Sequence, residues 1–145
     1  MQSAEGNISK VYFLKFEHGE NFREKLISFV KAKLIKHGVI NFIGALNNTN
    51  VVIGPIKDEL PAEPVWKSID SSCEVNGFGT IFWKGAEPVI HIHSIFSHGD
   101  RGFIGCLRND ANVFIVIEAI VTEISGVDIE RKFDTQTGLD LMHIN

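Results

Sequence analysis

Apolar and polar residues alternate with two different periods along this chain, and each period predicts a different kind of element. Between residues 21 and 37, apolar residues recur every three or four positions, which is the spacing of the buried side of an amphipathic helix. Asn21 and Glu24 have the spacing of a capping box, and Gly38 is of the residue type that ends helices in a left-handed conformation. We therefore expect one principal helix over about residues 21–37, ended by Gly38.

Most of the remaining chain consists of short apolar and β-branched runs that are typical of strands. These runs cover residues 11–16, 39–46, 50–53, 73–83, 88–96, 112–124 and 139–143. Only a tight turn at Asn47 and Asn48 separates 39–46 from 50–53, so we expect these two strands to be antiparallel neighbours. The run at 112–124 is apolar on both faces. That favours an interior strand, or a strand between the helix and a subunit interface.

Two features interrupt the strand pattern. The segment from Gly54 to Ser72 contains three of the four prolines and several acids, which predicts a surface loop or an edge excursion that Trp66 pins to the fold. Gly77 and Gly79 lie within the next strand run, where they predict a bulge or the close approach of another backbone.

The composition is that of a globular protein, with 44% hydrophobic and 22% charged residues and with 11 Phe against 1 Tyr and 2 Trp. A length of 145 residues fits one domain, which we place at residues 1–145 with its core at about 10–143. One helix packed on a mainly antiparallel sheet gives an α+β fold.

The charge balance limits the choice of partners. Acidic residues outnumber basic ones by 18 to 14, and the formal net charge is −4. Because nucleic-acid affinity comes largely from Lys and Arg that neutralise phosphates, direct high-affinity DNA binding by this domain is disfavoured. The one basic group, Lys25, Lys31, Lys33 and Lys36, is interpreted as the solvated face of the helix.

No segment has the pattern of an export signal or a membrane anchor. The first seven residues are polar, and the longest apolar run, Val113 to Val121, contains Glu118. That run is far shorter than the ~20 residues that span a bilayer. We expect a soluble cytoplasmic protein with no membrane partner, in which Cys73 and Cys106 are reduced thiols.

The strand run at Pro88–Phe96 concentrates the most chemistry. Alternate residues of a strand share a face, so His91 and His93 project from the same side with their Cα atoms about 6.6 Å apart. Cys106 follows in a segment bounded by glycines. Two imidazoles and a thiolate form a zinc-ligand set that leaves a fourth position for water, a carboxylate or another subunit.

Simpler interpretations exist for each of these residues. The two histidines can be partly buried and bonded to carbonyls, and Cys106 can be a small buried hydrophobe. His98 competes with Cys106 as the third ligand, although it lies in an expected exposed turn. Glu74 is expected to accept a hydrogen bond from a histidine or to be bonded by backbone amides at a bulge. Cys73 is assigned to the core.

Several short motifs lie in a fixed order along the chain. They are Gly19-Glu20, Ile43-Gly-Ala-Leu46, Glu74 with Gly79-Thr-Ile81, Pro88 with His91 and His93, Gly105-Cys-Leu107 and Thr137-Gly-Leu139. In this order the chain resembles the plant and prokaryote conserved (PPC) domain family, in its stand-alone prokaryotic form, from about Tyr12 to Leu141.

The resemblance implies an α+β domain that assembles as a homotrimer, with the histidine strand near the trimer contacts. Prokaryotic members resemble metal binders, with zinc as the expected metal, and the family's third histidine lies in a Gly-Gly-His-Leu motif. This chain has Ile104-Gly-Cys-Leu107 there, so Cys106 takes the place of a histidine and keeps a competent zinc ligand. The resemblance therefore couples His91, His93 and Cys106 as Zn²⁺ ligands.

Three classes of function are compatible with these residues. We favour a homotrimeric module with a zinc site and a regulatory or interaction role, which binds an unidentified small ligand or protein and reaches DNA only through partners. A small zinc-dependent hydrolase is the alternative, because an open metal position can lower the pKa of bound water. Sequence spacing places no general base there, so an enzyme is disfavoured. Direct DNA binding is the third class, and the plant relatives suggest it. Those relatives use a Gly-Arg-Pro AT-hook, however, and this chain lacks that tripeptide.

Overall fold

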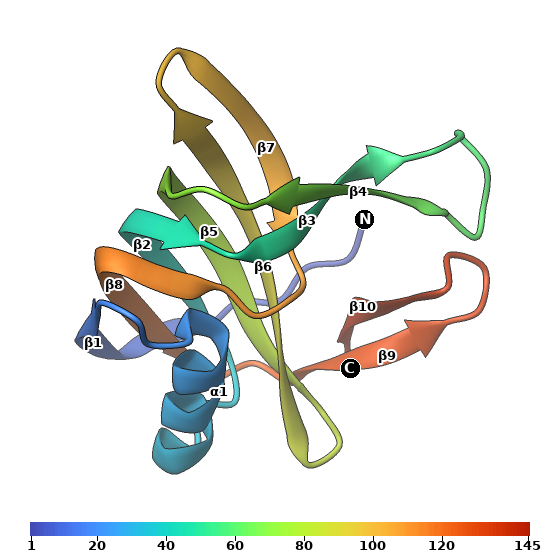
Figure 1. Ribbon diagram of the computed structural model, residues 1–145. Coiled ribbons are helices and arrows are strands. Elements are labelled where there is room, and N and C mark those ends of the chain that lie inside the picture. The colour runs from blue at the N-terminus through green and yellow to red at the C-terminus, as the bar shows by residue number, and fades with distance from the viewer.

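A strongly curved sheet with a single helix on one side makes up the computed structural model, which describes all 145 residues (Figure 1). In chain order the elements are β1 (Asn7–Glu17), α1 (Phe22–Lys33), β2 (Gly38–Asn47), β3 (Thr49–Pro55), β4 (Pro64–Ile69), β5 (Cys73–Lys84), β6 (Glu87–His98), β7 (Arg101–Leu107), β8 (Asn112–Ser125), β9 (Ile129–Asp134) and β10 (Leu139–Ile144). Apart from one parallel contact between β5 and β9, all strand pairs are antiparallel. The predicted α+β class is confirmed.

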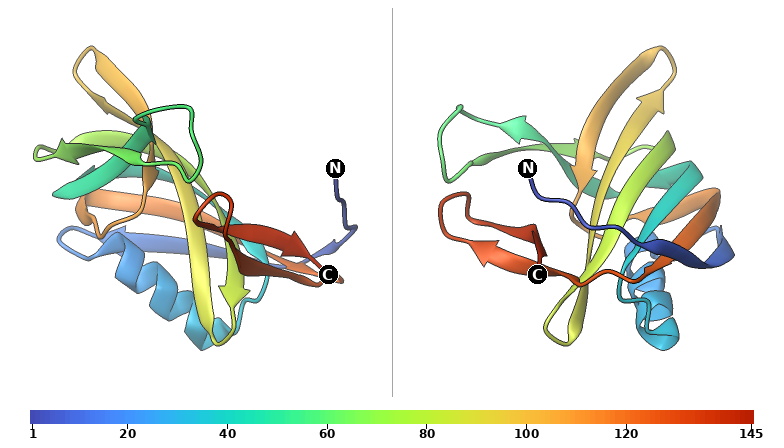
Figure 2. Two further views of the ribbon diagram at one scale, coloured as in Figure 1. Left: turned by 90° about the vertical axis from the view of Figure 1, so that its right-hand side faces the viewer. Right: turned by 180° about the vertical axis from the view of Figure 1, so that it is seen from behind.

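The strands run in the order β1-β8-β2-β5-β6-β7-β3-β4, and the β9–β10 hairpin joins β5 where Trp83 pairs with Glu130. Two arms project from the body of this sheet, one made of β3 and β4 and the other of β9 and β10 (Figure 2). Their tips approach each other at Pro61 and Gly138, where a Cβ added to the glycine would lie 3.2 Å from the proline Cβ.

The prediction that 39–46 and 50–53 pair with each other is wrong. β2 pairs with β8 on one edge and with β5 on the other, while β3 pairs with β4 and β7. Asn48 takes a left-handed conformation with φ 53° between them. Because both edges of β2 are already filled, the turn sends the chain out into an arm instead of back along β2.

Of the two alternatives predicted for segment 54–72, a surface loop or an edge excursion, the structure shows the edge excursion. The segment contains β4, which lies at the end of the sheet. Trp66 does not pin it by burial, because its side chain is 47% exposed and it pairs with Val52 at the edge. Of the two alternatives predicted for the glycines of β5, the bulge is absent, because β5 pairs with both neighbours without a register shift. The close approach of another backbone is found at Gly79, where an added Cβ would lie 2.9 Å from the His91 carbonyl oxygen. At Gly77 the space is filled by a ring, with an added Cβ only 2.1 Å from Cζ of Phe42.

The start of α1 agrees with the sequence, since Oδ1 of Asn21 accepts a hydrogen bond from the Glu24 amide at 3.1 Å. Its end does not agree. The helix stops at Lys33, and Leu34 takes the left-handed capping conformation with φ 55°. This earlier exit buries Ile35 completely, and that apolar contact outweighs the conformational preference of a glycine three residues later.

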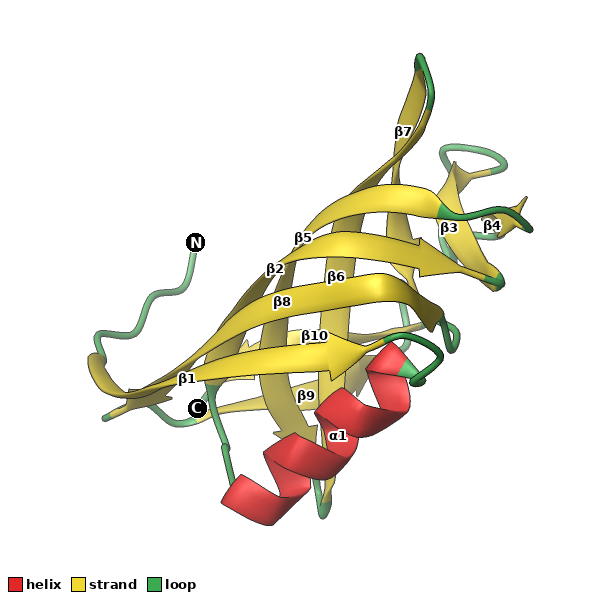
Figure 3. Cartoon of the chain, turned by 60° about the vertical axis from the view of Figure 1, so that its left-hand side comes forward, coloured by secondary structure: helices red, strands yellow, loops and turns green.

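The core lies between α1 and the concave side of the sheet, and α1 packs on β6 and β8 (Figure 3). β8 is an interior strand between β1 and β2, as its two apolar faces predict. In β6 the burial alternates strictly, with Ile90, Ile92 and Phe96 facing the core. The intervening residues, including both histidines, therefore face away from α1. The helix is too short and too polar to cross a bilayer.

Candidate metal centre

The two histidines of β6 share the outer face of the sheet, as their spacing predicts. β5 pairs with β6 over its whole length, whereas β7 pairs only with the part from His93 to His98. The register places Cys106 of β7 directly opposite His93. Residues in opposite positions of an antiparallel pair point to the same face, so the strand pairing brings the thiol to the histidines.

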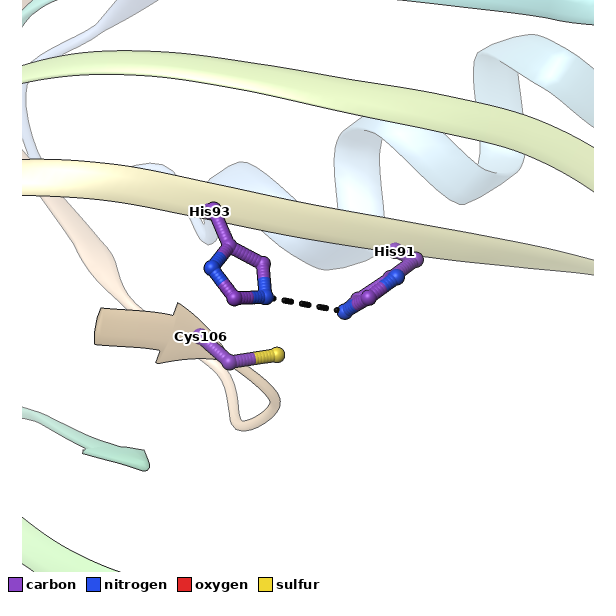
Figure 4. Close-up of side chains that lie close together, drawn as sticks. All are labelled: His91, His93 and Cys106. Atoms are coloured by element: carbon purple, nitrogen blue, oxygen red, sulfur yellow. Dashed lines mark hydrogen bonds between the residues drawn. The ribbon is translucent and has the colours of Figure 1, made fainter. Parts of the chain in front are cut away.

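The three side chains converge on one point (Figure 4). Their donor atoms all lie within 4.8 Å of one another, and the sulfur of Cys106 points toward both imidazole rings. The Nε2 atoms of His91 and His93 are 3.1 Å apart, and the rings meet nearly at a right angle, with centroids 4.9 Å apart. A hydrogen bond between the rings needs a proton on one nitrogen only, which is set by the tautomer.

This donor set fits a small tetrahedral cation. Zinc binds imidazole nitrogen at about 2.0 to 2.1 Å and thiolate sulfur at about 2.3 Å, so neighbouring ligand atoms in a tetrahedron lie roughly 3.3 to 3.7 Å apart. The separation of the two Nε2 atoms is already near this range, and all the donor atoms lie within 4.8 Å of one another. Three ligands would leave one position open to a further group.

The local electrostatics keep His91 neutral at pH 7. Its pKa is lowered from 6.5 to about 4, chiefly because packing removes water from the ring. Positive charge on His93, Arg131, Arg108 and Arg23 adds to the effect, in that order. A neutral imidazole has the free lone pair that metal binding needs.

The cysteines lie in different places and form no disulfide, as predicted. Cys106 is buried beside the histidines, with 4% of its surface exposed. Cys73 belongs to the hydrophobic core, as predicted, and its thiol donates to the Ser71 carbonyl at 3.7 Å. Burial raises the pKa of the Cys73 thiol, which makes it inert as a ligand.

The competing residues lie too far along the strands to reach the cluster. His98 is five residues beyond His93 on β6, about 16 Å away by strand rise, and its Nδ1 lies 2.8 Å from the Ser72 carbonyl oxygen. Glu74 pairs with Ser97 at the same distant end of β5. Its expected hydrogen bond to a histidine is therefore wrong, and no bulge exists there.

Three arginines near the cluster had no signal in the sequence that could have found them. Arg23 comes from the first turn of α1, Arg108 follows β7, and Arg131 belongs to β9. All three line a hollow that also includes His91 and Cys106. Arg131 joins the other two because β9 returns to pair with the end of β5, which no local pattern specifies.

Comparison with protein families matches residues 3–125 to the Plants and Prokaryotes Conserved (PCC) domain. The chain belongs to this family. It is the same family that the motif order resembles, and the matched region ends before β9. A metal-containing protein from Archaeoglobus fulgidus has 30% identity and a TM-score of 0.85, covering 97% of this chain and 98% of that one. A PPC protein from Pyrococcus horikoshii has 27% identity and the same TM-score, covering 99% of this chain and 97% of that one.

A more distant PPC-like fold occurs in a protein from Bacteroides thetaiotaomicron that is provisionally described as DNA-binding. It has 21% identity and a TM-score of 0.79, and the match covers 96% of this chain and 97% of that one. At 21% identity, this similarity shows a shared fold and nothing further. A comparison with proteins of curated function gives no significant match.

Proposed function

We propose that this chain is a homotrimeric PPC module in which His91, His93 and Cys106 hold a zinc ion, and that its role is regulatory or interactive. One observation carries the proposal: two imidazoles and a buried thiol from adjacent strands converge within 4.8 Å on an exposed face. The relative from Archaeoglobus fulgidus, described as metal-containing, supports a metal in this family. The ion would join β6 to β7 and present one open position for a ligand.

The homotrimer is supported by the apolar character of the face that carries the histidines. Phe78, Ile95 and Ile104 lie on that face next to them and are 50%, 51% and 62% exposed. On the β1 and β2 side, Phe13 and Ile43 are 79% and 54% exposed and border a hollow of about 520 Å³. Large exposed apolar side chains at several places on one sheet face are typical of a subunit interface.

An interaction role fits the charge of the protein better than direct DNA binding does. With a net charge of −4, the chain lacks the excess of positive charge from which duplex affinity arises. The description of a distant relative as DNA-binding is compatible with contact through partner proteins. We therefore infer that the module contributes an assembly surface and a ligand site, while any DNA contact lies elsewhere.

A small zinc-dependent hydrolase is the second candidate, and the open fourth position beside a hollow favours it. Such an enzyme needs a general base within hydrogen-bonding reach of the metal-bound water. The acid that lines the hollow, Asp140, is already engaged in an ion pair with Lys84 at 2.6 Å. This engagement makes a binding role the better supported of the two.

Elemental analysis of protein purified without added metal tests the site. About one zinc per chain is expected in the wild type and in His98→Ala, the matched control from the far end of β6. His91→Ala and Cys106→Ala should lose the metal, because two remaining ligands bind zinc weakly. Zinc retained in both variants would contradict the assignment.

Sedimentation tests the assembly separately. The wild type should have about three times the chain mass of 16.2 kDa, and Ile104→Asp should dissociate it, because a carboxylate in an apolar contact is strongly unfavourable. The control Lys57→Asp alters an exposed position of the β3–β4 loop and should leave the assembly intact. A wild-type protein of single-chain mass at micromolar concentration would exclude the homotrimer.

A further inference from the structure

A hollow of about 320 Å³ adjoins the candidate metal centre and is lined mainly by positive and apolar side chains. It lies where β6 passes between α1 and the β9–β10 hairpin (Figure 1). His91 and Cys106 form part of its wall, and Arg23, Arg108 and Arg131 approach it from three different elements. Three of the four arginines in the chain therefore meet at one place.

None of these three guanidinium groups forms an ion pair with a carboxylate, although the negative charges of Asp110 and Asp140 act on Arg23 and Arg131 from a greater distance. Every ion pair of the protein is made by a lysine, and none by an arginine. Asp140 also borders the hollow, but its carboxylate is bound to Lys84 at 2.6 Å. In a protein whose net charge is −4, three guanidinium groups that share a hollow with a single carboxylate, Asp140, are a local excess of positive charge.

Arg131 is the most enclosed of the three, with only 6% of its surface exposed. Its Nη2 donates to Oγ1 of Thr80 at 2.8 Å, and its Nη1 donates to the Asp140 carbonyl at 3.4 Å. Its Nε is buried and has no partner. A buried charge that lacks both a direct ion pair and one of its hydrogen bonds is unfavourable unless something supplies them.

Arg23 extends this positive surface toward the helix. Its Nη1 donates to the Ile90 carbonyl at 3.2 Å, on the edge of β6 that β7 leaves unpaired. Burial lowers the pKa values of Arg23 and Arg131, and the charges of all three arginines help to lower the pKa of His91. The hollow is thus a region of positive potential.

We propose that this hollow binds the anionic group, a carboxylate or a phosphate, of a small organic molecule, with Arg131, Arg108 and Arg23 as its donors. The guanidinium fork matches the oxygens of both groups. Val89, Leu139 and Leu141 on the lining provide apolar contact for the carbon skeleton. This proposal adds a ligand class to the function proposed above. It rests on that function for the metal ion that would lie next to the anion.

The shape of the hollow favours a small molecule over a nucleic acid. A duplex needs a row of exposed basic side chains along a surface, whereas here Arg131 is enclosed and apolar residues lie beside it. The C-terminal hairpin supplies Arg131, Leu139 and Leu141, so the recognition surface is completed by residues beyond the matched family region.

Isothermal titration calorimetry of the full-length protein, as purified and after metal removal, tests this inference. The probes are hexanoate, hexyl phosphate and neutral hexanol. We expect one or both anions to bind and hexanol not to bind, and the stronger anion identifies the carboxylate or the phosphate as the natural group. Arg108→Gln should weaken binding by about tenfold or more, since a charged hydrogen bond contributes roughly 1.5 to 3 kcal/mol.

The matched control is Arg101→Gln, which changes the exposed first residue of β7, outside the hollow. This variant should bind as the wild type does. Arg131→Lys keeps the charge but removes the fork, so its affinity should also fall, and circular dichroism checks that it folds.

Anion binding that persists in metal-free protein and depends on Arg108 supports the inference even if zinc is absent. Equal binding of hexanol, or no difference between Arg108→Gln and Arg101→Gln, would overturn it while leaving the metal assignment intact. Filling of the hollow by a partner subunit's carboxylate would overturn it too.

Discussion

Nη2 of Arg131 donates a hydrogen bond to Oγ1 of Thr80 at 2.8 Å, and this contact joins the β9–β10 hairpin to the outer face of β5. Backbone pairing between the hairpin and β5 is limited to Trp83 and Glu130, and Lys84 of β5 forms an ion pair with Asp140 of β10 at 2.6 Å. The guanidinium also lies over the ring of Phe82, 5.3 Å from its centroid. One buried arginine therefore helps to hold the last two strands against the sheet that carries the histidines, together with the more exposed ion pair of Lys84 and Asp140.

Replacing Thr80 with Val should weaken this attachment. The substitution leaves a buried guanidinium with one partner fewer, which costs about 1 to 3 kcal/mol. Urea unfolding measures the loss, and faster hydrogen exchange in residues 129–144 would localise it to the hairpin. Thr122→Val is the control, since Thr122 lies in β8 away from the hairpin, and it should change stability by much less. Equal effects of the two variants would contradict the role of the contact.

Replacing Gly77 with Ala should destabilise the core. The new methyl group would lie 2.1 Å from Cζ of Phe42 and 2.5 Å from Oγ of Ser94, so the ring must move out of its packed position. Overpacking of this kind costs about 1 to 3 kcal/mol. Gly102→Ala is the control, because its nearest atom would be at an ordinary 3.5 Å. Thermal unfolding should separate the two variants clearly, and a Gly77→Ala protein as stable as the wild type would show that the ring has room.

Replacing Trp83 with Phe should loosen the end of the helix. Nε1 of Trp83 donates to the Ile35 carbonyl at 2.6 Å, just after α1 ends, and Nζ of Lys36 lies 3.5 Å above the indole ring. The variant leaves a buried carbonyl without its donor, at about 1 to 3 kcal/mol. Trp66→Phe, at a half-exposed edge position, serves as the control in the same denaturation experiment and should be nearly neutral. If Trp66→Phe were the more harmful change, the contact with Ile35 would be unimportant.

His91 should make the metal-free protein sensitive to mild acid. Its pKa is 6.5 ordinarily and about 4 in the folded protein, so below pH 6.5 the unfolded chain takes up a proton there that the folded chain does not. Stability from this group is complete above pH 6.5 and is lost as the pH falls toward 4. His91→Asn should therefore lose less stability than the wild type between pH 7 and pH 4.5. Urea midpoints at the two pH values measure this, with His98→Asn as the control that keeps the wild-type acid response.

The helix shows which structural features a local sequence pattern can predict and which it cannot. The capping spacing of Asn21 and Glu24 specifies its first turn, because the hydrogen bond concerned lies within four residues. The place where it ends depends on the burial of Ile35, which in turn depends on the sheet beneath it. Gly38 has the residue type expected at the end of a helix, but in the structure it is the first residue of β2. A Cβ added there would lie 2.7 Å from the Thr122 carbonyl oxygen.

The candidate metal site, like the helix, was predictable from local sequence only in part. That His91 and His93 share a face follows from the two-residue period of a strand and needed no structure. The coupling to Cys106 followed from the motif order, and the register of β7 on β6 is what places the thiol opposite His93. Binding of a metal by the three residues remains a prediction.

The sequence by itself determined the periodicities of the chain: one amphipathic helix, a series of strands and the common face of the two histidines, with the interior position of β8 as one of two alternatives. These follow from interactions between residues a few positions apart. Only the tertiary structure decided that β2 and β3 separate and that Arg23, Arg108 and Arg131 meet beside His91. Strand pairing and the return of the last hairpin depend on which edges are free and which apolar faces can be covered. Those are properties of the whole folded chain, and no local stretch of it encodes them.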